Sequence, residues 1–189
     1  MLSAFLTGFI LGLSLILAIG AQNSFVLRQG LMGNYVFTIA LFCSLSDTLL
    51  IFIGVAGISI FFNNYINLVS DWLFIISAVW LLGYGLLRLK DAIKGNSVLT
   101  VEGTLDGGIT STLSFLVVIT FANPHVYLDT IVLIGSISQQ FPGNIKLAYA
   151  IGASLASFVF FFSLAYGAKF FAPIMQKPIA WRILDSFIA

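Results

Sequence analysis

Residues 113–137 of the chain read LSFLVVITFANPHVYLDTIVLIGSI. A bilayer has a hydrocarbon core about 30 Å thick, and roughly 20 apolar helical residues cross it. The stretch is long and apolar enough, yet its middle holds a proline and several polar side chains, which are Asn123, Pro124, His125, Tyr127 and Asp129. It therefore predicts a membrane helix that is broken where polar groups are required.

The composition places the whole chain in a membrane. Of its 189 residues, 60% are hydrophobic and only 8% are charged, and the mean hydropathy is +1.09. In soluble domains about a quarter of the residues are charged. We therefore expect an all-α integral membrane protein with a single transmembrane domain in the lipid bilayer. A net charge of +1 without a basic cluster argues against nucleic acid as a partner.

Apolar runs predict about six transmembrane helices in this domain. The runs cover residues 2–27, 35–62, 72–87, 113–137, 147–168 and, in part, 180–189. The last run is about half as long as a crossing requires, so we expect a truncated sixth helix. Residues 90–108 mix both charges with glycine, serine and threonine, which predicts a solvated loop.

Two further patterns concern the arrangement of the helices. Most Lys and Arg residues lie in the odd-numbered loops, which predicts that these loops face the cytoplasm and that the N-terminus faces outside. With an offset of 110 residues, Ser44 and Gly57 align with Ser154 and Gly167. This similarity between the second and fifth helices favours a 3+3 inverted repeat, an architecture common among secondary transporters.

Asp47 lies near the middle of the second run, where insertion scales penalise an aspartate by roughly 2.5 to 3.5 kcal/mol. It is either a protonated or hydrogen-bonded packing residue, or a carboxylate that faces a cavity. Intramembrane carboxylates usually face a cavity and serve a pathway, so Asp47 is a candidate site residue.

His125 and Asp129 are four residues apart, which places them on one helical face. A single histidine in a helix is more often a packing residue, but a histidine one turn from a carboxylate can relay a proton or hold a cation. Asn123 and Tyr127 have the same spacing and form a neighbouring stripe.

Pro124 removes a backbone donor and clashes with the carbonyl of Thr120. Lipid cannot satisfy freed carbonyls, so a break here indicates packing against protein or a watery cavity, with a simple kink as the alternative. Gly20, Gln22 and Asn23 loosen the end of the first run in a similar way. Half-helix ends present amides to anions and carbonyls to cations, a combination that suits a zwitterion.

The chain has no HExxH, GxSxG, P-loop or CxxC motif, and Cys43 is its single cysteine. The sequence therefore shows no standard motif for hydrolytic, nucleotide-driven or redox chemistry. We expect a transporter driven by an ion gradient or the membrane potential, not an enzyme, with no cofactor and no resident metal.

Three segments together resemble the LysE/ArgO family of basic amino-acid exporters: LAIGAQNSFVLRQGL (17–31), CSLSDTLLIFIGVAG (43–57) and NPHVYLDTIVLIGS (123–136). The resemblance implies a multi-pass protein of the bacterial inner membrane that exports L-arginine, L-lysine or close analogues. The arginine-exporter branch is nearest, because NPHVYLDT matches its form. Family members often carry Gly-Pro-Gln-Asn where this chain has Gly20, Ala21, Gln22 and Asn23, so Gly20 alone must permit unwinding there.

Within this resemblance, Asp47 and Asp129 are candidate anionic sites for the substrate's cationic groups or for a coupling proton. Two aspartates balance a dibasic substrate better than a neutral pocket does. The other candidates for substrate binding or coupling are Asn123, His125, Tyr127, Gln22 and Asn23, with Gly20 and Pro124 as helix breaks.

Three alternatives stay open from the residues. A divalent metal exporter would use His125, Asp129 and Asp47 as hard ligands. A neutral amino-acid exporter would belong to the same superfamily. A membrane enzyme would use His125 and Asp129 as an acid–base pair, although no nucleophile motif accompanies them.

Overall fold

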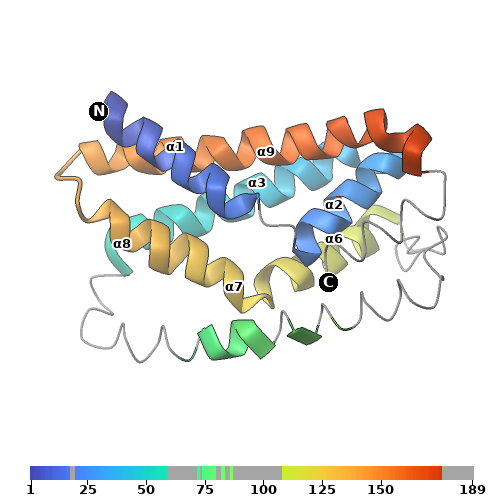
Figure 1. The fold of residues 1–189 in the computed structure, drawn as a ribbon, viewed down its shortest axis with the longest axis horizontal. Helices are drawn as coiled ribbons and strands as arrows, with labels where there is room; N and C mark the ends of the chain where they lie inside the picture. Colours follow the sequence, from blue (N-terminus) through green and yellow to red (C-terminus); the bar gives the residue numbers. More distant parts are fainter. Residues whose placement is uncertain are drawn as a thin grey trace.

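The computed structural model describes residues 1–17, 20–58, 72, 74–79, 82–83, 86 and 108–175, and all regular structure among them is helical (Figure 1). The elements in chain order are α1 (Leu2–Ile16), α2 (Ala21–Met32), α3 (Val36–Ile53), the π-helical turn η1 (Gly54–Ile58), α6 (Gly108–Phe121), α7 (Pro124–Tyr127), the π-helical segment η2 (Leu128–Ile134), α8 (Gly135–Ser138) and α9 (Ile145–Met175). The all-α prediction is confirmed for this part of the chain.

Two of these segments are long and apolar enough to cross a membrane without interruption, namely Val36–Gly57 and Ile145–Phe170. Two further candidates are bent pairs: α1 with α2 at 83°, and α6 with Pro124–Ser138 at 61°. If each bent pair is one span, the described residues hold up to four spans. The broken helix expected within residues 113–137 is therefore present.

The first apolar run differs from its predicted bounds of 2–27. The structure ends α1 at Ile16 and begins a second helix at Ala21, which continues to Met32. Gly20 has an extended backbone, with φ −99° and ψ −170°, and this conformation separates the two helices. Gly33, with φ 74°, ends α2 in the left-handed conformation that glycine adopts without a steric penalty.

Helices α6 and α9 extend beyond the apolar runs 113–137 and 147–168. Gly108, the last residue of the predicted loop, is the first residue of α6, and α9 is longer than the run 147–168. The described residues between 72 and 86 are helical. The rest of the loop 90–108, the end of the run 35–62 and the sixth run 180–189 lie outside the described residues.

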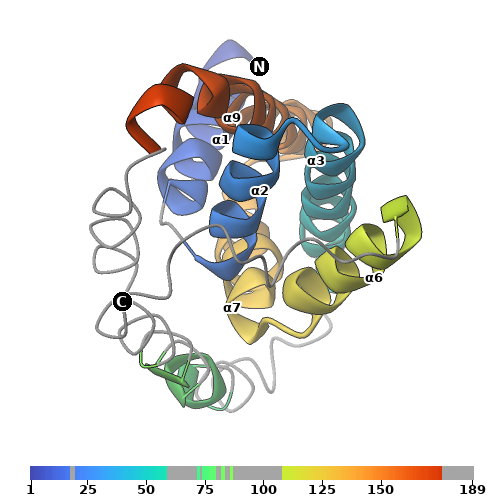
Figure 2. The ribbon, with the colours of Figure 1, turned by 90° about the vertical axis from the view of Figure 1, so that its right-hand side faces the viewer.

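Helix α9 runs along one side of the bundle and packs against α1, α2 and α3 (Figures 1 and 2). Small residues permit this close packing. A Cβ atom at Gly12 would lie 3.1 Å from the carbonyl oxygen of Ala153, and one at Gly8 would meet the backbone of Tyr149. The GxxxG pattern of the first helix therefore serves helix packing within this chain.

Two buried apolar clusters support the region between them. One joins α2, α3, α6 and α9 and includes Phe25, Ile39 and Phe161. The other joins α1, α3, η1, η2 and α9 and includes Ile51 and Ile134. Phe161, Ile51 and Ile134 also border the cavity described next, so both clusters fix its walls.

Candidate functional site

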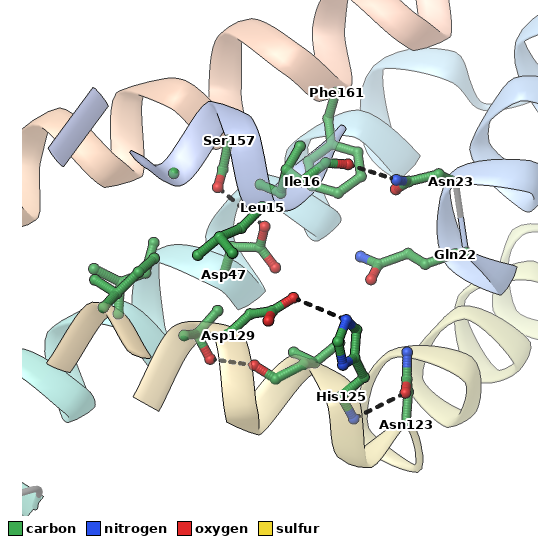
Figure 3. A pocket seen from close by; sticks show the side chains of 16 residues that line it. Leu15, Ile16, Gln22, Asn23, Asp47, Asn123, His125, Asp129, Ser157 and Phe161 are labelled. Carbon is green, nitrogen blue, oxygen red and sulfur yellow. Dashed lines mark hydrogen bonds and ion pairs between the residues drawn. The ribbon is translucent and has the colours of Figure 1, made fainter. Parts of the chain in front are cut away.

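A cavity of about 80 Å³ lies where the two helix breaks meet (Figure 3). A cavity needs roughly 10–15 Å³ to hold a single water molecule, so this space is large enough for water. Its lining comes from α1, α2, α3, α7, η2, α9 and the segments that join them. The lining residues are Gly12, Leu15, Ile16, Gly20, Gln22, Asn23, Asp47, Ile51, Asn123, His125, Val126, Asp129, Thr130, Ile134, Ser157 and Phe161.

The first break is held together by a side chain that reaches across it. Asn23 Nδ2 donates to the carbonyl oxygen of Ile16 at 2.9 Å, so α2 caps the last turn of α1. The last carbonyls of a helix have no intrahelical partner, and a buried carbonyl requires one. Asn23 meets this requirement at the cavity wall.

The second break is a complete helix restart, not a kink. Asn123 is extended, with φ −83° and ψ 110°, and its Oδ1 accepts a hydrogen bond from the backbone N–H of His125 at 3.0 Å. Pro124 occupies the first turn of α7, where its missing N–H is not needed. The Tyr127 hydroxyl donates to the carbonyl oxygen of Phe121 at 2.7 Å, which satisfies the end of α6.

Asp47 projects from α3 and is 4% exposed. Ser157 Oγ on α9 donates to its Oδ2 at 3.0 Å. The Ser157 carbonyl oxygen accepts in turn from Ser44 Oγ at 3.4 Å, a bond that links α3 and α9 a second time. A single hydroxyl partner does not compensate for the transfer of a carboxylate out of water, so this group favours a cation in the cavity.

Asp129 and His125 form the opposite wall. His125 Nε2 lies 3.4 Å from Asp129 Oδ2, one turn along the same helix, and the pair is ionic when the histidine is protonated. The histidine side chain is 38% exposed and that of Asp129 is 18% exposed. This pair is therefore more accessible than Asp47, although both carboxyl groups line the same cavity.

The structure brings together most of the predicted site residues. Those that line the cavity are Asp47, Asp129, Asn123, His125, Gln22, Asn23 and Gly20. Tyr127 is not in the lining, and its hydroxyl donates to the carbonyl oxygen of Phe121. Pro124 shapes the wall as the first residue of α7.

The sequence reasoning missed Ser157, Thr130 and the apolar wall residue Phe161. Ser157 was within reach, because the offset of 110 residues that aligns Ser44 with Ser154 also pairs Asp47 with Ser157. No pattern in the sequence identified Thr130 as a residue of the cavity. Its hydroxyl donates to the Val126 carbonyl at 2.6 Å, a bond common to threonines in membrane helices.

Among the residues that the structure describes, no three His, Cys, Asp or Glu side chains are grouped closely enough to hold a metal ion. The cavity instead combines two separated carboxyl groups with amide donors.

Comparison with known proteins gives a consistent result. The model of the family described as LysE type translocators matches residues 13–189. The chain is 36% identical to the arginine exporter protein ArgO of Pectobacterium carotovorum subsp. carotovorum (strain PC1), with 100% of this chain and 92% of that protein covered. It is 37% identical to the arginine exporter protein ArgO of Salmonella enteritidis PT4 (strain P125109), of which 89% is covered. The putative amino-acid transporter YggA of Aeromonas salmonicida is 36% identical, with 91% covered. No solved structure matches the chain.

Proposed function

The chain belongs to the family of LysE type translocators, and we propose that it is a secondary active exporter of L-arginine, L-lysine or both across the bacterial inner membrane. The observation that carries this proposal is the cavity shared by Asp47 and Asp129 at the junction of two helix breaks. The names of the relatives, which are arginine exporters, point to the same substrate class.

Charge balance favours a dibasic substrate. Arginine and lysine carry two positive groups and one carboxylate, and two aspartates on the cavity wall offset the positive charge. In a low-dielectric site, an uncompensated charge is costly, whereas a paired one is tolerated. A neutral amino acid would leave one aspartate without a cationic partner.

The coupling ion that we propose is a proton, carried by Asp129 with His125. These two groups are one helical turn apart and partly exposed, so water can deliver a proton to them. A histidine one turn from a carboxylate can relay a proton. Asp129 would release this proton in exchange for one cation of the substrate, while Asp47, buried and bonded to Ser157, binds the other.

We further propose the 3+3 inverted repeat as the architecture of the whole transporter. Support comes from a pattern that occurs twice: a bent helix pair is followed by an uninterrupted helix, first in α1, α2 and α3, then in α6, α7–α8 and α9. Broken helices in corresponding positions of the two halves mark the binding site in many secondary transporters.

The test is export of radiolabelled L-arginine and L-lysine from cells that express the wild type, Asp47→Asn or Asp129→Asn. We expect export by the wild type and a loss of at least tenfold in either variant. Protection of the cells against canavanine should follow the same order. Wild-type rates in both variants would remove these residues from the mechanism, and protection against metal stress in place of canavanine would favour the metal-export alternative.

A further inference from the structure

The Gln22 side-chain amide is a buried donor that the proposed cation sites leave unused. Gln22 is the second residue of α2, lines the cavity and is 7% exposed. Its Nε2 atom is buried and donates no hydrogen bond to any described residue. The Cys43 thiol lies beside this amide, but sulfur is a weak acceptor. Buried donors are normally satisfied, so this donor on the cavity wall is available to a bound ligand.

The same wall carries the N-terminus of α2. This helix has twelve residues, and Gly20 at its N-cap supplies no side-chain cap. The backbone N–H of Ser24 donates to the carbonyl oxygen of Gly20 at 3.0 Å, which is the first backbone hydrogen bond of the helix. The first N–H groups of a helix lack intrahelical partners and carry the positive end of the helix dipole, which makes this terminus suited to an anion.

The two ends of the cavity therefore differ in charge preference. Figure 3 shows the Gln22 amide pointing into the cavity toward the side that holds the Asp47 and Asp129 carboxyl groups, while the Asn23 amide turns to Ile16. His125 is the other titratable residue in the lining, and it pairs with Asp129. A molecule with a carboxylate at one end and cations at the other matches this separation.

We propose that Gln22 Nε2 and the N-terminus of α2 form a subsite for the α-carboxylate of the exported amino acid. The inference rests on the proposed function and deepens it, because it orients the substrate: the carboxylate lies at α2, and the amino and side-chain cations lie toward Asp47 and Asp129. It follows that amines without a carboxylate are poor substrates.

Transport in proteoliposomes tests the subsite with two probes, L-arginine and L-argininamide. Argininamide keeps the guanidinium and the α-amino group but has a neutral amide in place of the carboxylate. In the wild type, we expect the KM for argininamide to be about tenfold above that for arginine. Gln22→Leu should raise the KM for arginine by about tenfold and that for argininamide by less than twofold, so the preference disappears.

Two other variants keep the test decisive. Gln140→Leu makes the same chemical change at an exposed position outside the cavity and should leave both KM values unchanged. Gln22→Glu keeps the side-chain length but adds a negative charge that repels a carboxylate. It should therefore impair arginine export more than Gln22→Leu does. Within this variant, argininamide export should be impaired less than arginine export. This variant also provides the readout if Gln22→Leu does not fold.

Two results would overturn the subsite alone: a wild type that exports arginine without preferring it to argininamide, or Gln22 variants that lose both probes equally. A wild type that exports neither probe would contradict the proposed function itself and the subsite with it.

Discussion

Asp47 and Ser157 form the most buried polar contact of the site, and this contact joins α3 to α9. The serine hydroxyl holds one carboxylate oxygen at 3.0 Å and leaves the other oxygen for a ligand. A hydrogen bond to a charged group contributes roughly 1.5–3 kcal/mol, which is less than the cost of burying the charge. Ser157 therefore positions the carboxyl group, and we propose that a substrate cation completes its environment.

Replacement of Ser157 by alanine should weaken arginine export, because Asp47 loses the hydrogen bond that positions its carboxyl group. We expect a rise in KM of about tenfold, equivalent to about 1.4 kcal/mol. The double variant Asp47→Asn/Ser157→Ala should be no worse than Asp47→Asn alone, because the two residues act as one unit. Transport kinetics of the four proteins in proteoliposomes measure this cycle.

Ser136→Ala serves as the control, since Ser136 is exposed and outside the cavity lining. Additive losses in the double variant would show that Ser157 acts independently of Asp47.

At the scale of the elements, both helix breaks are closed by side chains that satisfy backbone carbonyls. Asn23 serves Ile16 at the first break, and Tyr127 serves Phe121 at the second. Open carbonyls inside a membrane are costly unless protein or water satisfies them. Both helix ends are therefore satisfied in this conformation, and the polar cavity between them does not require unsatisfied backbone at α1 or α6.

Tyr127→Phe should lower stability without weakening substrate binding. The hydroxyl donates to Phe121 and is not in the cavity lining, so its loss removes one hydrogen bond, about 1 kcal/mol. We expect a lower Tm in detergent and less than a twofold change in the KM for arginine. Tyr166→Phe on the exposed face of α9 is the matched control. A large rise in KM with an unchanged Tm would instead make Tyr127 a substrate ligand.

The contact between η1 and η2 leaves no room for a side chain at Gly54. A Cβ atom there would lie 2.8 Å from the Thr130 carbonyl oxygen and 2.8 Å from Ile131 Cα, both backbone atoms that cannot move independently. Gly54→Ala should therefore displace the segment that carries Asp129. We expect a loss of stability of about 1–3 kcal/mol and reduced arginine export.

Gly167→Ala is the control for this variant, because a Cβ atom at Gly167 meets nothing within 4 Å. Thermal unfolding in detergent measures the difference. Equal Tm values for the two variants would show that η2 accommodates the added methyl group.

The elements also show what the sequence could and could not predict. The sequence was sufficient to identify Asp47, His125 and Asp129, because an ionisable side chain within an apolar run is energetically costly and usually has a function. The continuation of α2 beyond residue 27 could not be predicted from the sequence. Gln22 and Asn23 were interpreted as the end of the first helix, whereas in the structure they belong to the first turn of the second helix. The direction of the Tyr127 side chain depends on where α6 ends, a tertiary detail that spacing along one helix does not contain.

At the scale of the whole molecule, α9 holds the bent pairs around one cavity. It contacts α1, α2 and α3, and it contributes Ser157 and Phe161 to the cavity wall. Glycine and alanine residues bring α1 and α9 into close contact, whereas the two breaks are the places where the chain changes direction. We expect changes in cavity access to take place at the breaks and not along α9.

Equilibrium binding of L-arginine to the purified protein tests most directly whether Asp47 and Asp129 form one substrate cavity. The wild type should bind arginine, and Asp47→Asn and Asp129→Asn should each raise the Kd by at least about tenfold, or about 1.4 kcal/mol, while both variants remain folded. Folded Asp47→Asn and Asp129→Asn proteins that both bind arginine with the wild-type Kd would contradict the account.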